Sequence, residues 1–320
     1  MPVRIGIALP VRELAILGNN DAAPLMKMSQ QVEELGFDSV WVGDSFVARH
    51  RLEPLTLLAA MAMVTDRVTI GTAALTVALR EPLTLAHTIV TLDQLAGGRL
   101  TLAFGTGAPL PVQAEYDAVT MPYRERAGRV DEAVKAFKRV WRQEEGDLAG
   151  EYYDLSGLRL QSPPTQVGGP DLWLASNGKP GAVARTATLY DGWMPIKITP
   201  DEYRQSLQAI RDATRAAGRD PAAISTALYV TVNMNQDAER AEAGLNDYTH
   251  RYNELPLSAM TPYQLYYGGS AEDFAAWLGE YAAAGARHFV LRIGSFVDYE
   301  TQVHTIADGV VPRVHEMTAD

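Results

Sequence analysis

The sequence predicts a single α/β domain over residues 1–320, a (β/α)8 TIM barrel. Two observations lead to this prediction. Eight short apolar segments alternate with helical patterns along the chain, and no change in composition divides it into separate domains. In addition, residues 68–107 encode a complete strand–helix–strand unit, and a helix crossover of this kind joins parallel strands. A closed ring of such units is therefore expected.

The unit 68–107 contains the clearest of these patterns. Residues 68–75 are β-branched and apolar, as expected for a strand buried on both faces. Pro82 suits the first turn of a helix, where the missing N–H costs nothing. The helix carries apolar residues at three- and four-residue steps and ends at the glycine pair 97–98. The next strand, 99–104, opens into a Gly-Thr-Gly loop, so a flat cofactor could lie against bare backbone there.

The chain before this unit predicts two strands and the first site residues. Segment 3–9 is a short apolar strand, and an amphipathic helix from about residue 24 ends at Gly36. A second strand, 38–43, is followed directly by Asp44 and Ser45. Active sites of (β/α)8 barrels lie at the carboxyl ends of the strands, and a carboxylate after an apolar strand needs a hydrogen-bond partner. Asp44 and Ser45 are therefore candidate site residues.

The loop that follows contains a possible proton donor. Arg49, His50 and Arg51 can hold or protonate an anion, and a helix over 54–64 comes next. Imidazole titrates near neutral pH, which makes His50 a candidate proton donor. The alternative is an ordinary exposed loop histidine.

The second half of the chain continues the alternation with two insertions. Residues 146–170, after the fourth strand, are rich in Gly and Pro and predict a surface hairpin and linker. Residues 246–269, after the seventh strand, contain five tyrosines and predict a partly helical insertion that could form a lid. The regular segments expected in this half are helix 123–141, strand 171–175, a helix through 182–187, strand 191–195, helix 200–217, a strand within 223–234, helix 271–284, strand 287–293 and a last helix from about 299.

Composition and charge exclude several classes of function. The 28 Lys and Arg against 39 Asp and Glu give a formal net charge of −11, which argues against binding nucleic acid or an anionic membrane surface. The absence of cysteine excludes disulfides and thiolate metal sites. No signal peptide and no apolar run of about 20 residues is recognisable, so we expect a cytoplasmic protein.

Familiar catalytic motifs are also missing. The six histidines lack metal-ligand spacing, and no Walker loop, GxSxG elbow or GxGxxG after a strand occurs. The residues at the carboxyl ends of the predicted strands are instead small or polar, and they expose backbone groups. Residues 176–178 precede a helix, so their N–H groups and the helix dipole could hold a phosphate, with Lys179 adding charge. The alternatives are an ordinary N-cap and a solvated lysine.

Five segments in order carry a resemblance to a known family. They are ELGFDSVWVGDSF, IGTAAL with LAHTIVTLDQLAGGRLTLAFGTG, YRERAGRVDEAVKAFKRVW, GEYYDLSG and PDLWLASNGKPGAVARTATLYDGWMP. The chain resembles the superfamily of luciferase-like flavin-dependent monooxygenases and F420-dependent oxidoreductases over almost its whole length. The resemblance implies a flavin or deazaflavin ring across the carboxyl ends of the strands, with a bulge and a non-prolyl cis peptide at Ala73-Ala74. The implied cofactor-binding residues are Asp44, Ala73, Ala74, Thr106, Gly107, Ala175, Ser176, Asn177, Gly178 and Lys179.

The phosphate segment is closer to the F420-dependent branch than to the FMN-dependent branch, so F420 is the expected cofactor and FMN the alternative. Two departures concern the reaction. Ser45 stands where F420-dependent dehydrogenases carry histidine, and Ala108 where they carry glutamate. Protons would then come from Ser45, His50 or a tyrosine of the 246–269 insertion.

The function implied is an oxidoreductase that transfers hydride to or from a small organic substrate, as a homodimer. An FMN-dependent monooxygenase supplied by a separate reductase is the first alternative. A flavin-binding protein without catalysis is the second.

Overall fold

The computed structural model describes residues 2–45, 47, 49–107, 113–144, 149–157 and 159–317. Eight parallel strands form a closed barrel, because β6 pairs with β7 and β1 pairs with β9. The predicted (β/α)8 barrel is confirmed. The barrel strands are β1 (Arg4–Ala8), β2 (Ser39–Val42), β3 (Thr69–Thr76), β4 (Leu100–Gly105), β5 (Asp171–Leu174), β6 (Gly192–Trp193), β7 (Ser225–Met234) and β9 (His288–Ile293).

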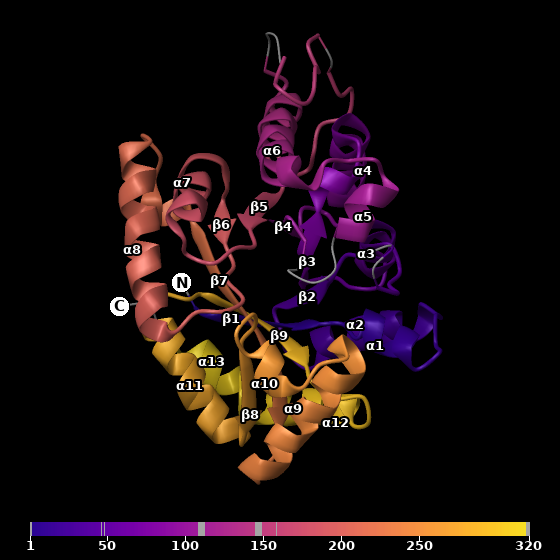
Figure 1. Ribbon diagram of the computed structural model, residues 1–320, viewed down its shortest axis with the longest axis vertical. Helices are drawn as coiled ribbons and strands as arrows, with labels where there is room; N and C mark the ends of the chain where they lie inside the picture. The colour runs from indigo at the N-terminus through magenta and orange to yellow at the C-terminus, as the bar shows by residue number, and fades with distance from the viewer. Residues whose placement is uncertain are drawn as a thin grey trace.

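Helices surround these strands, as Figure 1 shows. None of the helices in the described ranges is long and apolar enough to cross a membrane. Their bounds are α1 (Val11–Ile16), α2 (Ala23–Glu34), α3 (Pro54–Ala62), α4 (Pro82–Leu95), α5 (Gln113–Ala118), α6 (Arg126–Arg142), α7 (Pro180–Leu189), α8 (Pro200–Ala216), α9 (Ala238–Asn253), α10 (Leu257–Met260), α11 (Ala271–Ala283), α12 (Tyr299–Gly309) and α13 (Val311–Glu316).

Proline and capping residues fix where several of the helices begin. Helices α3, α4, α7 and α8 each start with proline at the first position. The Glu81 side chain accepts hydrogen bonds from two N–H groups of the first turn of α4. Thr199 and Glu202 form a reciprocal capping box at α8. These local signals explain why the predicted helix starts agree closely with the structure.

The tyrosine-rich range 246–269 contains the end of α9, then α10 and a ninth strand, β8 (Tyr266–Gly269). The sequence does not predict this strand. β8 pairs parallel with Thr231–Met234 at the carboxyl end of β7, on the side where two-residue β6 pairs with the start of that strand. Two of its four residues are glycine, which weakens the strand signal, and its partner is distant in sequence.

The range 146–170 is partly outside the described residues, since 145–148 and 158 are not covered. In the described part, Ala149 and Asp154 form an antiparallel bridge. The Glu132 carboxylate on α6 accepts hydrogen bonds from the backbone N–H groups of Glu151, Tyr152 and Tyr153 at 2.7–3.2 Å. This segment is therefore attached to the outside of α6.

An aromatic layer fills the inside of the barrel. Trp41 of β2 and Trp173 of β5 lie with ring centroids 5.4 Å apart, and His288 of β9 meets both rings edge-on at 5.5 Å. Glycines make room for them, since a Cβ at Gly71 would lie 2.5 Å from the Trp41 ring and one at Gly192 would lie 2.3 Å from the Trp173 ring. The layer packs against Ala73, Ala74 and Ala175, so it supports the strand ends from below.

Candidate active site

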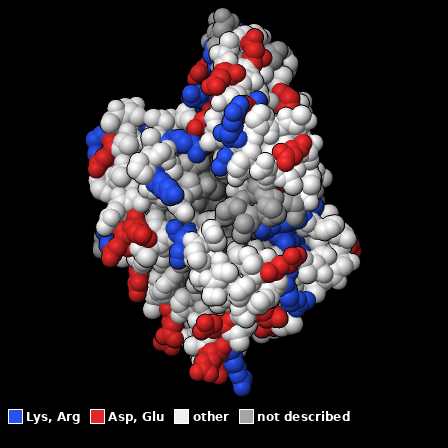
Figure 2. Space-filling view, in the orientation of Figure 1, with Lys and Arg blue, Asp and Glu red and all other residues white. Residues whose placement is uncertain are grey.

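A cavity of about 310 Å³ lies at the carboxyl ends of the strands. Its size is within the range of small-molecule sites. Figure 2 shows the face toward the viewer hollowed near its centre, with Lys and Arg side chains close to the hollow. The sequence-predicted residues that line the cavity are Asp44, Ser45, Ala73, Ala74, Thr106, Gly107, Ala175, Ser176 and Asn177.

Three predicted residues are not part of this lining. His50 and Lys179 are exposed. Gly178 packs on α8, where an added Cβ would lie 2.0 Å from the Ser206 hydroxyl oxygen. A glycine is therefore required at 178 for packing.

One wall of the cavity is made of small residues on neighbouring strands. Ala73 and Ala74 at the end of β3 are joined by a cis peptide, and the pairing of β3 with β4 shifts register there. This confirms the bulge and the cis bond that the family resemblance implies. Gly105 lies beside Ala74, because its added Cβ would be 3.3 Å from the Ala74 Cβ. With Thr106 and Gly107, these residues present a surface of backbone and methyl groups.

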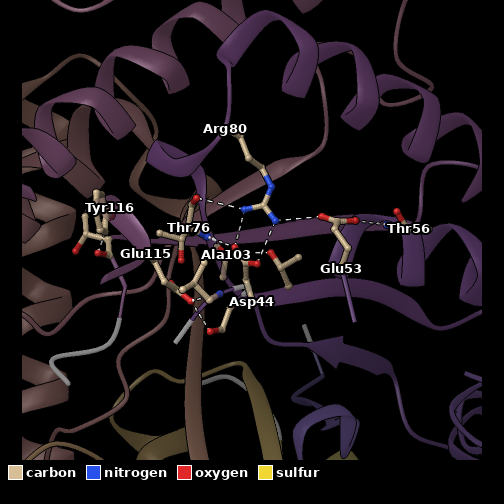
Figure 3. A network of polar contacts seen from close by, with 12 residues as sticks. Asp44, Glu53, Thr56, Thr76, Arg80, Ala103, Glu115 and Tyr116 are labelled. Carbon is tan, nitrogen blue, oxygen red and sulfur yellow. Dashed lines mark hydrogen bonds and ion pairs between the residues drawn. The ribbon is translucent and has the colours of Figure 1, made fainter. Parts of the chain in front are cut away.

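Asp44 is held by an ion pair at the edge of this surface (Figure 3). Its side chain is 1% exposed, and its two oxygens accept hydrogen bonds from both terminal nitrogens of Arg80 at 2.7 and 3.1 Å. The Thr76 N–H donates to the same carboxylate at 2.8 Å. Burial alone would lower the pKa of Arg80, but Asp44 and Glu53 outweigh burial and raise it. Asp44 is thus a fixed carboxylate that ties the loop after β2 to the end of β3.

Ser45 has a partner that sequence reasoning missed. Its hydroxyl donates to the Glu115 carboxylate at 2.5 Å, and both side chains are almost fully buried at the cavity. Glu115 belongs to the short helix α5, and its neighbour Tyr116 donates a hydrogen bond to the Thr106 carbonyl at 2.9 Å. Nothing in the spacing of α5 distinguishes Glu115 from a surface residue. Ala108 lies outside the described residues.

The loop after β5 has the features of an anion site. The Ser176 hydroxyl is buried and has no hydrogen-bond partner among the described residues. The Ser176 carbonyl accepts the indole N–H of Trp193 at 2.8 Å, which fixes the loop just before α7. An unsatisfied buried hydroxyl beside a helix N-terminus can bind a phosphate oxygen.

A basic and aromatic wall lies on the other side of the cavity. Arg51, Tyr252 and Arg292 line it, and Arg51 donates to the Tyr252 hydroxyl at 2.5 Å. Burial would raise the pKa of Tyr252, but the charges of Arg51 and Arg292 outweigh burial and lower it. Sequence reasoning named Arg51 for its charge and Tyr252 only as part of the insertion. The described residues contain no cluster of His, Asp and Glu arranged to hold a metal ion.

A closed parallel barrel with a cavity at the carboxyl ends of its strands is the arrangement in which barrel enzymes carry their active sites. The sequence profile of the luciferase-like monooxygenases matches residues 3–297. The chain belongs to this family, and it is an oxidoreductase of that family.

Individual relatives support the assignment. An F420-dependent glucose-6-phosphate dehydrogenase of Kineococcus radiotolerans is 32% identical over 249 residues, 75% of this chain and 71% of the relative. Two solved structures share the fold. An F420-dependent secondary alcohol dehydrogenase in complex with an F420–acetone adduct superposes with a TM-score of 0.83 at 20% identity, covering 98% of this chain and 99% of the other. A Baeyer–Villiger monooxygenase from Pseudomonas putida in complex with FMN gives a TM-score of 0.73 at 17% identity, covering 97% and 98%.

Proposed function

We propose that the protein uses coenzyme F420 to transfer hydride to or from a small organic substrate. The observation that carries this proposal is the cavity wall of Ala73, Ala74 and the 105–107 loop, which offers a planar ring a surface of backbone and methyl groups. The similarity to an F420-dependent dehydrogenase at 32% identity supports the choice of cofactor. When bound, F420 would supply a two-electron hydride donor or acceptor.

The residues present fit such a group. The small-residue wall would hold the ring, with Asp44 keeping the end of β3 in place through Arg80 and Thr76. Ser176 and Asn177 would hold the phosphate, because the buried Ser176 hydroxyl lacks a partner among the described residues. Gly178 and Lys179 belong to the same proposed loop.

The proton that accompanies hydride transfer needs a carrier in the cavity. We assign it to Ser45 together with Glu115, since their hydrogen bond connects a hydroxyl to a carboxylate at the cavity lining. A carboxyl group in this position can act as a general acid or base. Asp44 acts as a positioning residue, because its oxygens are already engaged. His50 is exposed and remains a predicted alternative.

Calorimetric titration with F420 and with FMN tests the cofactor. We expect F420 to bind with a dissociation constant of about 1 µM or below, a free energy near −8 kcal/mol, and FMN not to bind. FMN binding without F420 binding would favour the second candidate, a monooxygenase fed by a separate reductase, which the fold shared with the FMN complex supports. Binding of neither cofactor would contradict both proposals.

Assembly and lid formation are part of the same proposal. A homodimer is expected, and light scattering of the purified protein would measure its mass.

The range 246–269 would close over the bound substrate, since Tyr252 and Gln264 from this range line the cavity. Turnover of any substrate by the F420-loaded protein would exclude a non-catalytic flavin-binding protein.

A further inference from the structure

We infer that the cavity holds an oxyanion group of the substrate, a carboxylate or a phosphate, between Arg51 and Arg292. This inference rests on the proposed function, because it concerns the molecule that meets the cofactor. Both residues line the cavity, and both approach the ring or the hydroxyl of Tyr252.

Arg51 has hydrogen-bonding capacity that the described protein does not use. One terminal nitrogen donates to the Tyr252 hydroxyl at 2.5 Å, but its Nε is buried without a partner among the described residues. Its other terminal nitrogen is packed against the backbone after β2, since a Cβ on Gly43 would lie 2.5 Å from it. No carboxylate in the described ranges lies within 4.0 Å of this guanidinium. The absence of a side chain at position 43 is what lets Arg51 reach the cavity.

Arg292 completes the pair from the end of β9. Its side chain is buried, its Nε donates to the Thr231 hydroxyl at 2.9 Å, and one terminal nitrogen has no partner among the described residues. Its guanidinium carbon lies 4.6 Å from the centroid of the Tyr252 ring. Leaving buried donors of a charged group unpaired is costly, so two such groups at one cavity indicate that a ligand supplies the acceptor.

The charges around Tyr252 agree with an anionic ligand. Arg12 lies 4.3 Å from the same ring centroid, so three guanidinium groups surround one tyrosine. The carboxylate on this wall is Glu13, which accepts a hydrogen bond from Tyr248 at 2.5 Å. The other two cavity carboxylates are already engaged, Asp44 by Arg80 and Glu115 by Ser45. The wall around Tyr252 thus carries a positive excess.

The barrel order separates this pair from the proposed phosphate loop. Arg51 lies in the loop after β2 and Arg292 lies near the end of β9, and these two strands flank β1. Ser176 follows β5, which is separated from β1 by three strands in either direction around the ring. The cofactor phosphate and the substrate anion would therefore bind on opposite walls. An anchored oxyanion would orient the rest of the substrate toward the surface formed by β3 and β4.

Calorimetry with small probe ligands tests the inference on F420-loaded and on cofactor-free protein. The probes are propionate, methyl phosphate and neutral propionamide. We expect at least one anion to bind and propionamide not to bind. Arg51→Met and Arg292→Met should each lower the affinity for the anion by about 10- to 100-fold, as expected for the loss of hydrogen bonds to charged groups. The preference for propionate or methyl phosphate identifies which oxyanion the site accepts.

Two further variants separate charge from geometry. Arg240→Met removes a charge from a side chain that is 79% exposed on α9, and it should leave anion binding unchanged. Gly43→Ala keeps every charge but displaces the Arg51 side chain, so it should lower the affinity for the anion. Gly43→Ala also remains informative if an arginine variant fails to fold, which circular dichroism would reveal.

Three results would overturn the inference. The first is propionamide binding as tightly as propionate, and the second is anion binding that is unaffected in both arginine variants. The third is an equal loss of F420 affinity and anion affinity in the two arginine variants. The last result would mean that the cofactor's own acidic groups occupy Arg51 and Arg292. Uptake of F420 without binding of either anion would likewise overturn the inference, but it would leave the proposed function standing. Arginine-dependent anion binding without F420 uptake would refute the proposed cofactor and leave this site intact.

Discussion

Asp44 and Arg80 form the ion pair on which the cavity edge depends. Asp44→Ala would leave Arg80 without its buried partner, and we expect the free energy of unfolding to fall by about 3 kcal/mol. Glu53→Gln is the matched control, because it removes the other carboxylate partner of Arg80, whose side chain is 46% exposed. That change should cost less than about 1 kcal/mol. Urea unfolding measures both losses of stability. Equal losses would show that the buried ion pair of Arg80 with Asp44 contributes no more to stability than its exposed ion pair with Glu53.

His288 makes the stability of the protein depend on pH. Burial, with a smaller effect from the charge of Arg4, lowers its pKa to about 3. The unfolded chain takes up this proton near pH 6.5, so the stability contributed by neutral His288 is complete above that pH and is lost as the pH falls toward 3. The loss should be about 1.4 kcal/mol for each pH unit within this window. Urea unfolding at several pH values should show this slope in the natural protein and a shallower one in His288→Asn.

Most of the site residues that the sequence predicts follow a strand directly, and that is why they could be found. Asp44, Ser45 and Ser176 each come just after an apolar strand, and all three line the cavity. Glu115 and Arg12 carry no such signal, because they lie on short helices whose position depends on distant parts of the chain. Arg51 had a visible charge, but its approach to Tyr252 depends on packing across 201 residues of sequence.

Among the elements, β6 shows how glycine controls the inner layer. Gly192→Ala would push a methyl group into the Trp173 ring, and we expect a loss of about 1–3 kcal/mol in the free energy of unfolding. Gly181→Ala in α7 is the control, because its added Cβ meets nothing within 4 Å. That substitution should raise stability by up to about 1 kcal/mol. Thermal unfolding measures both changes. The account would be contradicted if the two substitutions shifted the unfolding temperature in the same direction.

The elements that the sequence predicts well are those with strong local signals. Strand β3 is a run of β-branched and small apolar residues, and α4 begins at Pro82 and ends before a glycine pair, so both are recognisable without tertiary information. Helix α1 has six residues and no side-chain cap, and β8 is stabilised by pairing with a distant strand. Their formation depends on packing and pairing that a sequence pattern does not contain.

For the whole molecule, cofactor binding should raise the free energy of unfolding. If F420 binds the folded chain and not the unfolded one, a concentration of about 100 times its dissociation constant should raise the free energy of unfolding by about 2.7 kcal/mol. FMN at the same concentration should have no effect. Thermal unfolding with each cofactor measures the difference, and an equal shift with both would argue against selectivity for the deazaflavin.

The closed ring of strands could be predicted because eight repeats in one chain have few other ways to bury their apolar strands. The position of β8 above the short β6 could not, since it depends on how far each strand extends before it leaves the barrel. The pairing of Ser45 with Glu115 has the same origin, because it joins the ends of two separate strand–helix units.

The tryptophan pair inside the barrel gives the protein an optical reporter of its own. Trp41 and Trp173 belong to the layer that packs against Ala73, Ala74 and Ala175, the residues on which a coloured ring would rest. Over so short a separation, ultraviolet light absorbed by the indoles would pass to such a ring as excitation energy. Occupancy of the cavity would therefore dim the emission of the protein itself, without any attached dye.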